Sequence, residues 1–163
     1  MATDTHQTSR NYALVQTVVF CAFAAAFFLD AGPRLFPPGV VSGAVSAVLC
    51  LAGVLLLLAA FGSIGGAIQI APEPRPGARL VTKGVYARLR HPIYTAIVIL
   101  VVGLLLRKPT AVIGIGAAVV IAFLVVKVRF EEKLLLTRYP EYAEYKERTW
   151  GILLWSRRSR TIR

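Results

Sequence analysis

Residues 93–126 read IYTAIVILVVGLLLRKPTAVIGIGAAVVIAFLVV, and the two apolar runs in this stretch decide the fold. The first run, 93–106, would form a helix of roughly 21 Å at ~1.5 Å per residue. The second, 110–126, approaches the ~20 residues that cross the hydrocarbon of a bilayer. The connection at 107–109 is short enough to require that the two helices be antiparallel neighbours. The stretch therefore predicts a helical hairpin in a membrane.

Two further apolar runs, 12–29 and 40–61, precede this hairpin, and each is about long enough to span a bilayer. With 56% hydrophobic residues and a mean hydropathy of +0.65, the chain is too apolar for a small soluble domain. We expect an all-α polytopic membrane protein with about four transmembrane helices, built as one membrane domain over residues 1–163. Small residues in the second run, such as Gly43 and Gly53, predict that it packs against the first and fourth helices.

Within that single domain, residues 1–70 would hold the first two helices, and residues 71–163 a loop, the hairpin and a tail. The segment before the first helix carries only Arg10 as a cation, so we expect that helix to be retained rather than cleaved as a signal peptide. Cys21 and Cys50 lie inside apolar runs, which predicts buried thiols rather than a disulfide, and no metal-ligand spacing is present.

The net charge of +11 is concentrated beside the apolar runs rather than within them. Of the 19 Lys and Arg residues, only Arg34, Arg107 and Lys108 would lie at one end of the four helices. Because basic residues concentrate on the cytoplasmic side of a membrane, we expect both termini and residues 70–92 to be cytoplasmic, in a bacterial-type inner membrane. The basic tail predicts contact with anionic membrane lipid, and nucleic acid is not an expected partner.

A basic turn, GVYARLRHPIY at residues 84–94, leads into the hairpin. A proline drives the preceding residue toward extended backbone, so Arg90 and His91 should lie on a bent corner, with Pro92 opening the third helix. Non-helical backbone at that depth persists only where it is buried in protein or lines a polar cavity. Two interpretations remain open: Arg90 and His91 bind a ligand, or Arg90 anchors the membrane and His91 caps the helix.

Two adjacent carboxylates, Glu131 and Glu132, lie at the mouth of the fourth helix within FEEKLL, residues 130–135. Neighbours on a helix point ~100° apart, so we expect that they cannot share one partner. One should turn inward, and the other should face Arg129, Lys133 or solvent. Carboxylates near the bilayer mark either a site or an ion pair, and both interpretations stay open.

A tyrosine repeat follows in YPEYAEYKER, residues 139–148, where Tyr139-Pro140 should end the fourth helix. Tyr139, Tyr142 and Tyr145 recur every three residues and predict one aromatic face on a short helix. That face could be an interfacial aromatic belt. Alternatively it could close over a flat ring such as adenine.

The predicted hairpin would bring the cationic corner, the carboxylates and the aromatic face together at one membrane face. The product would be a polar pocket, with carboxylates for an amino or sulfonium group and His and Arg for a carboxylate. S-adenosylmethionine carries all of these groups and an adenine.

As an ordered set, these residues resemble the isoprenylcysteine carboxyl methyltransferases, with the phospholipid methyltransferases as more distant kin. The resemblance spans residues 80–148 and is carried by Leu80-Val81-Thr82, Gly84, Tyr86, Arg90-His91-Pro92, Tyr94, Glu131-Glu132, Leu135, Glu141-Tyr142, Tyr145-Lys146 and Arg148. It implies S-adenosylmethionine as the cofactor. The implied cofactor-binding residues are Leu80, Val81, Gly84 and Tyr86 at the adenosine, His91, Tyr94 and one of Glu131 and Glu132 at the methionine moiety, and Tyr142 in the aromatic cover. The implied catalytic residues are Arg90, as the cation facing the acceptor, with Glu131 and Glu132.

The function implied by this resemblance is methyl transfer from S-adenosylmethionine to a lipid-like or isoprenoid acceptor, of which a prenylated cysteine carboxylate is the type. A carboxylate acceptor needs no general base, so alignment and exclusion of water would supply most of the acceleration. A phospholipid amine, a small thiol and a non-catalytic membrane interaction protein remain alternatives. Membrane sterol reductases have a related hairpin, but about four spans are too few for them. The oligomeric state is left open.

Overall fold

The computed structural model describes residues 2–37, 39–64 and 80–152 of the chain. These residues form helices and no strand, which confirms the predicted all-α polytopic membrane architecture. The elements in chain order are α1 (Ala2–Leu29), α2 (Val40–Ile64), a single 3₁₀ turn η1 (Gly84–Ala87), α3 (Pro92–Arg107), α4 (Ala111–Arg138) and α5 (Tyr142–Arg148).

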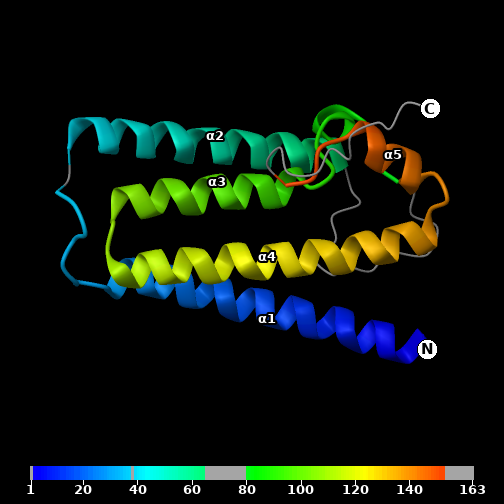
Figure 1. Ribbon diagram of the computed structural model, residues 1–163, viewed down its shortest axis with the longest axis horizontal. Coiled ribbons are helices and arrows are strands. Elements are labelled where there is room, and N and C mark those ends of the chain that lie inside the picture. Colours follow the sequence, from blue (N-terminus) through cyan, green and yellow to red (C-terminus); the bar gives the residue numbers. More distant parts are fainter. Residues whose placement is uncertain (1, 38, 65–79, 153–163) are drawn as a thin grey trace, which may run out of the picture.

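Four of these helices lie side by side, in the spatial order α2, α3, α4, α1 (Figure 1). Three of them are long and apolar enough to cross a membrane: Gln7–Leu29 of α1, Val40–Ile64 of α2 and Ala111–Arg138 of α4. The fourth, α3, is apolar but has only 16 residues. The predicted hairpin of residues 93–126 is the α3–α4 pair, and α4 continues beyond its apolar run to Arg138.

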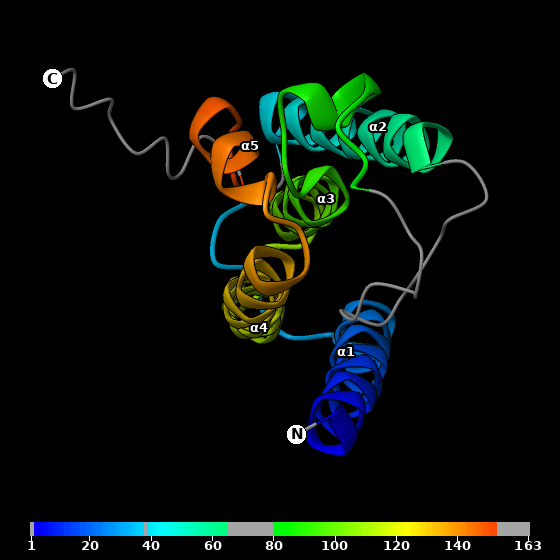
Figure 2. The same cartoon turned by 90° about the vertical axis from the view of Figure 1, so that its right-hand side faces the viewer.

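Viewed end-on, α3 lies between α2 and α4, and α1 lies on the far side of α4 (Figure 2). The prediction that the second helix packs against the first and fourth is therefore wrong, because its partner is α3. Glycines on both helices explain the pairing. A Cβ on Gly53 of α2 would lie 2.6 Å from Leu100 Cγ, and one on Gly103 of α3 would lie 2.8 Å from Cys50 Sγ. The small residues do permit close approach, but to α3.

Polar contacts stabilise the end of the bundle where the chain leaves α1 and where it passes from α3 to α4. Thr110 Oγ1 donates to Asp30 Oδ2 at 2.7 Å, and Lys108 Nζ donates to the Phe27 carbonyl at 2.7 Å. The hydrogen bond from Thr110 holds the pKa of Asp30 below its ordinary value, assisted by the Gly32 N–H. The Thr110 hydroxyl also accepts from Ile113 N, so the same residue caps α4.

The corner before α3 forms as Pro92 dictates. His91 has φ −125° and ψ 60°, outside helical geometry, and Pro92 is the first helical residue. At the other end of the hairpin, α4 stops at Arg138, and the chain turns through Tyr139 and Pro140 into α5. Successive helices run in opposite directions. The N-terminus of α1, the end of α2, the start of α3, the end of α4 and all of α5 therefore lie at one end of the bundle (Figure 1).

Candidate active site

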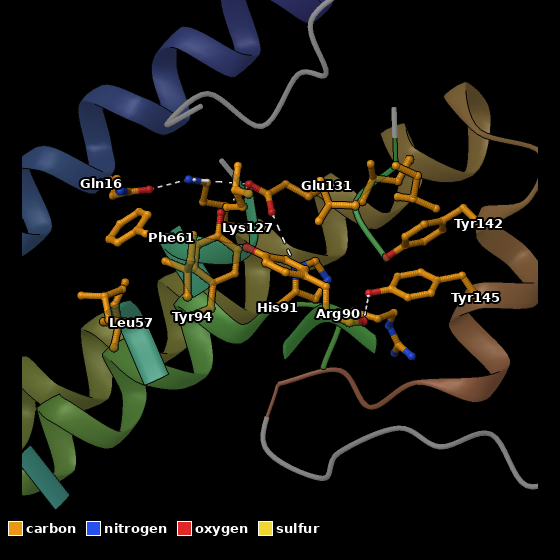
Figure 3. A pocket seen from close by; sticks show the side chains of 17 residues that line it. Gln16, Leu57, Phe61, Arg90, His91, Tyr94, Lys127, Glu131, Tyr142 and Tyr145 are labelled. Atoms are coloured by element: carbon orange, nitrogen blue, oxygen red, sulfur yellow. Dashed lines mark hydrogen bonds and ion pairs between the residues drawn. The ribbon is translucent and has the colours of Figure 1, made fainter. Parts of the chain in front are cut away.

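A cavity of about 430 Å³ opens at this end, and residues from all five helices and the basic turn line it (Figure 3). One part of its wall is apolar and is made by Leu57, Phe61, Ile64, Ile93, Ile97 and Leu135. The remainder carries polar and aromatic side chains from the corner, from α4 and from α5. A cavity of this size with an apolar wall and a few convergent polar groups is typical of a small-molecule site.

Glu131 is the carboxylate that lines the cavity, and it accepts a hydrogen bond from Tyr94 Oη at 2.5 Å. Its Oε1 also lies 3.7 Å from Lys127 Nζ, one turn earlier on α4. On the other side of the carboxylate, Oε2 lies 3.9 Å from Nδ1 of His91, whose ring stacks on Tyr94. Glu131 is thus surrounded by donors, and a ligand cation in the cavity would meet its negative charge.

Glu132 does not line the cavity but binds the corner to α5. Its Oε1 accepts from Arg90 Nε at 3.0 Å, and its Oε2 accepts from Lys146 Nζ at 2.6 Å. Arg90, whose side chain is 1% exposed, also donates through Nη1 to the carbonyls of Lys146 and Thr149. The main chain adds a bridge here, because Arg90 N donates to Trp150 O at 2.8 Å. This network fixes α5 and the segment after it over the end of α3.

One of the two glutamates, Glu131, turns into the cavity as predicted, but the prediction that the other faces Arg129, Lys133 or solvent is wrong, because Glu132 binds Arg90 and Lys146. Both side chains are largely buried, with 12% and 14% exposure, because α3 covers one face of α4 and α5 covers the adjacent face. The expectation that they cannot share a partner is also wrong. The imidazole of His91 has two nitrogens, and its Nε2 lies 3.5 Å from Glu132 while Nδ1 faces Glu131.

The tyrosine face contains two of the three predicted members. Tyr142 and Tyr145 are 1% and 2% exposed and line the cavity, whereas Tyr139 caps the end of α4 and lies before α5 begins. Tyr145 Oη donates to the Tyr86 carbonyl at 2.6 Å. Burial raises the pKa of both Tyr86 and Tyr145 to about 12 and raises that of Tyr142 further, so all three hydroxyls keep their protons at neutral pH.

The hydroxyl of Tyr142, a buried polar atom at the cavity, has no hydrogen-bond partner among the described residues, and Nε2 of His91 has only the 3.5 Å contact with Glu132. In Figure 3 the Tyr142 hydroxyl points toward the cavity, in the direction of His91. A buried polar atom left without a partner costs about 1–3 kcal/mol. Such atoms facing a cavity are suited to a ligand that supplies the missing partner.

The structure brings eight of the ten predicted site residues to this cavity: Leu80, Val81, Tyr86, Arg90, His91, Tyr94, Glu131 and Tyr142. Gly84 and Glu132 do not line it. Gly84 has φ +60°, and a Cβ there would lie 2.3 Å from Ser63 Oγ, so glycine is needed to pack the turn on α2.

Sequence reasoning missed two polar lining residues, Gln16 of α1 and Lys127 of α4. In the sequence, Lys127 is one of the basic residues that flank the apolar runs. Its spacing of four residues before Glu131 is the signal that could have identified it, because side chains at this spacing share a helix face. Gln16 had no comparable signal, since its partner Lys127 is 111 residues away.

The fold and the cavity define a class of protein, a bundle of apolar helices with a partly polar cavity at one end. The sequence model of the phospholipid methyltransferase family matches residues 41–157, so the chain belongs to that family. The family comprises integral membrane methyltransferases related to the isoprenylcysteine carboxyl methyltransferases, which confirms the resemblance found in the sequence.

Two relatives match over the same length. They are the cobalt-zinc-cadmium resistance protein CzcN of Cupriavidus metallidurans and the nickel-cobalt-cadmium resistance protein NccN of Alcaligenes xylosoxydans xylosoxydans. Each is 33% identical to this chain over 109 residues, which is 64% of this chain and 49% of the relative. The chain therefore spans about half the length of the curated relatives it matches.

Proposed function

We propose that this protein is a membrane methyltransferase that uses S-adenosylmethionine and acts on a lipid-like or isoprenoid acceptor, of the carboxylate type found in isoprenylcysteine methylation. The observation that carries the proposal is the cavity itself. It joins an apolar wall to a polar part in which Glu131, His91 and the unpartnered hydroxyl of Tyr142 converge. Family membership supplies the reaction class.

The residues present fit the cofactor. Glu131 can face the ammonium or sulfonium group, and His91 Nε2 and the Tyr142 hydroxyl can bind its polar groups. Tyr86, Tyr142 and Tyr145, with Leu80 and Val81, provide an aromatic and apolar cover suited to adenine. When bound, S-adenosylmethionine supplies an electrophilic methyl group on a sulfonium.

The residues of this chain would bind and orient the cofactor and the acceptor and would exclude water from them. A carboxylate acceptor is already ionised at neutral pH, so no side chain has to remove a proton from it. The Tyr94 hydroxyl, bonded to Glu131, fixes that carboxylate in one orientation. The apolar wall of Leu57, Phe61 and Ile97 keeps water from the reacting atoms, and alignment of donor and acceptor can supply several kcal/mol.

Arg90 and Glu132 enter the proposal as positioning residues. Two nitrogens of the Arg90 guanidinium already bind Glu132 and two main-chain carbonyls, which favours a role in fixing α5 over direct contact with an acceptor. Glu132 lies behind the cavity wall in the same network. The catalytic contacts are then left to Glu131, His91 and Tyr94.

We further propose that the cavity end of the bundle is cytoplasmic, together with both termini. The support is the distribution of charge, because Arg34, Arg107 and Lys108 are at the opposite end. A water-soluble cofactor would then enter from the cytoplasm, and a lipid-like acceptor from the bilayer. The described residues contain no group of three or more His, Cys, Asp or Glu side chains that could hold a metal ion, so the resistance named for the two relatives does not enter the proposal.

The test is S-adenosylmethionine binding by calorimetry on protein in a non-ionic detergent. Wild type should bind saturably, and His91→Ala and Glu131→Ala should each weaken binding by at least about tenfold, the loss of one charge-assisted contact. Glu144→Ala is the matched control, because Glu144 is an exposed acid on α5 with 78% side-chain exposure. Folded wild type that binds neither S-adenosylmethionine nor S-adenosylhomocysteine would refute the proposal and favour a non-catalytic interaction protein.

A further inference from the structure

Lys127 is a buried cation inside the cavity that the proposed reaction does not yet use. Its side chain is 1% exposed, and it lines the cavity. Its Nζ bonds to Oε1 of Gln16 and lies 5.3 Å from the centroid of the Tyr94 ring. Burying a lysine charge is costly, so a buried lysine that lines a cavity calls for a specific role.

The position of Lys127 is where the polar part of the cavity meets the apolar wall. Figure 3 shows its Nζ between Gln16 and Glu131, on the side of the cavity where Phe61 and Leu57 lie. The tyrosines of α5 lie at the opposite side of the same view. A ligand group bound by Lys127 would therefore be next to the apolar wall and away from the tyrosines proposed to cover adenine.

The charges around the cavity favour an anion at this position. Among the described residues that line the cavity, Arg90 and Lys127 provide two positive charges and Glu131 provides one negative charge. Bound S-adenosylmethionine would add one more positive charge, from its sulfonium, ammonium and carboxylate together. A second ligand that carries a negative charge would reduce this excess inside a site of low dielectric constant.

Gln16 comes from a helix that the family match does not include. The match covers residues 41–157, and α1 ends at Leu29. The Gln16 carboxamide accepts from Lys127 and has two N–H donors of its own, so the pair can present several donors to one anion. The proposed cofactor contacts all lie within the matched region, whereas this pair also needs α1, which lies outside it.

We infer that Lys127 and Gln16 form an anion subsite that holds the negatively charged oxygen group of an amphiphilic methyl acceptor, whose apolar chain lies along Leu57, Phe61 and Ile97. The inference rests on the proposed function. Two sources share this chemistry. The anion is either a carboxylate that is itself methylated or the phosphodiester of a phospholipid whose neighbouring amine is methylated.

For the carboxylate, one oxygen is held at Lys127 and the other forms the new bond to the methyl carbon. The carbon–sulfur bond breaks, its electron pair stays on sulfur, and the products are a methyl ester and a neutral thioether. For the phospholipid, the nitrogen lone pair of the uncharged amine forms the bond, and the resulting ammonium loses its proton to solvent.

The test is calorimetry with matched probe pairs on protein loaded with S-adenosylhomocysteine. The first pair is N-acetyl-S-farnesylcysteine and its neutral carboxamide, and the second is dihexanoyl-phosphatidylethanolamine and dihexanoylglycerol. Wild type should bind the member of one pair that carries the anionic oxygen group, the carboxylate or the phosphodiester, at least ~10-fold more tightly than its match without that group, and that pair identifies the source. Lys127→Met should abolish this preference while leaving the affinity for the neutral probe within about threefold.

Three further variants make the result specific. Lys127→Arg keeps the positive charge and should keep the preference for the charged probe. Gln16→Leu should reduce this preference severalfold and leaves the Glu131 side chain in place. Lys133→Met, an exposed lysine on the same helix, should match wild type. If Lys127→Met does not fold, the Gln16→Leu and Lys127→Arg comparison still decides the inference.

Equal binding of charged and neutral probes by wild type, or a preference that survives in Lys127→Met or is unchanged in Gln16→Leu, overturns the subsite. Failure of the proposed function is a separate outcome. Wild type that does not bind S-adenosylhomocysteine refutes the cofactor, while the probe preference, measured without it, still tests the subsite.

Discussion

Glu131 and Glu132 are adjacent in the chain, yet they lie in two different environments. Glu131 faces the cavity and is held by the Tyr94 hydroxyl, whereas Glu132 lies behind the wall, bound to Arg90 and Lys146. The difference arises because α3 and α5 cover adjacent faces of α4. The comparison suggests two separate roles for two identical residues, cofactor binding for Glu131 and stabilisation of α5 for Glu132. A change at Glu131 should then lower cofactor affinity, and a change in the Glu132 network should lower thermal stability.

The largest effect should come from a change that breaks the contacts between Arg90, Glu132 and α5. Arg90→Ala removes the bonds to Glu132 and to two main-chain carbonyls and leaves a buried carboxylate short of a partner. We expect a loss of about 3–5 kcal/mol. Intrinsic tryptophan fluorescence during heating should show an apparent Tm lower than wild type by about 6 °C or more. Arg148→Ala, from an exposed pair with Glu144, should change Tm very little, and equal melting of the two variants would contradict the assignment.

Glu131→Gln should have the opposite effect, a large loss of cofactor affinity with little loss of stability. The amide keeps an oxygen that can accept from Tyr94 but loses the charge that faces the cavity. We expect the Kd for S-adenosylmethionine to rise by roughly 10- to 100-fold, with a Tm change of only a few degrees. Calorimetry and thermal melts on the same preparation give both numbers. If Glu132→Gln, tested beside it, loses affinity as strongly at equal stability, the division between the two carboxylates is wrong.

The two buried tyrosines of α5 should also differ, with a smaller effect on cofactor affinity for one and on stability for the other. Tyr142→Phe removes a hydroxyl that has no partner among the described residues, so stability should be kept while cofactor affinity falls about three- to tenfold. Tyr145→Phe removes the donor to the Tyr86 carbonyl and should cost about 1 kcal/mol of stability with little change in affinity. Identical profiles for both variants would remove the distinction.

The smallest effect concerns alkaline pH. Burial raises the pKa of Tyr86 and Tyr145 to about 12, from an ordinary value of 10.0. The folded protein therefore binds these protons more tightly than the unfolded chain does. The associated stability is fully present below pH 10 and is lost as the pH rises toward 12. Apparent Tm measured from pH 8 to 11.5 should fall above pH 10, and the fall should be shallower in Tyr145→Phe. A flat profile in wild type would show that these phenols are not the controlling groups.

Local sequence signals predicted most of the elements. The apolar runs located the three long helices and the shorter α3, Pro92 placed the corner at His91, and Tyr139-Pro140 separated α4 from α5. Each of these signals acts over a few residues, through backbone geometry or the thickness of a bilayer. Arg90, His91, Tyr94 and Glu131 meet at the cavity for the same reason, since the short hairpin connection makes α3 and α4 antiparallel neighbours.

The sequence alone thus determined that the chain is a bundle of membrane helices, roughly where α2, α3 and α4 lie, and that most of the polar site residues collect at one end, whereas α1 begins at Ala2, ten residues before its apolar run. Only the tertiary structure decided that α2 pairs with α3 through Gly53 and Gly103, that Glu131 rather than Glu132 faces the cavity, and that Gln16 reaches Lys127. The physical reason is distance along the chain. Hydrophobic length and proline geometry are local properties, whereas close packing and a buried ion pair depend on which distant surface covers each helix face.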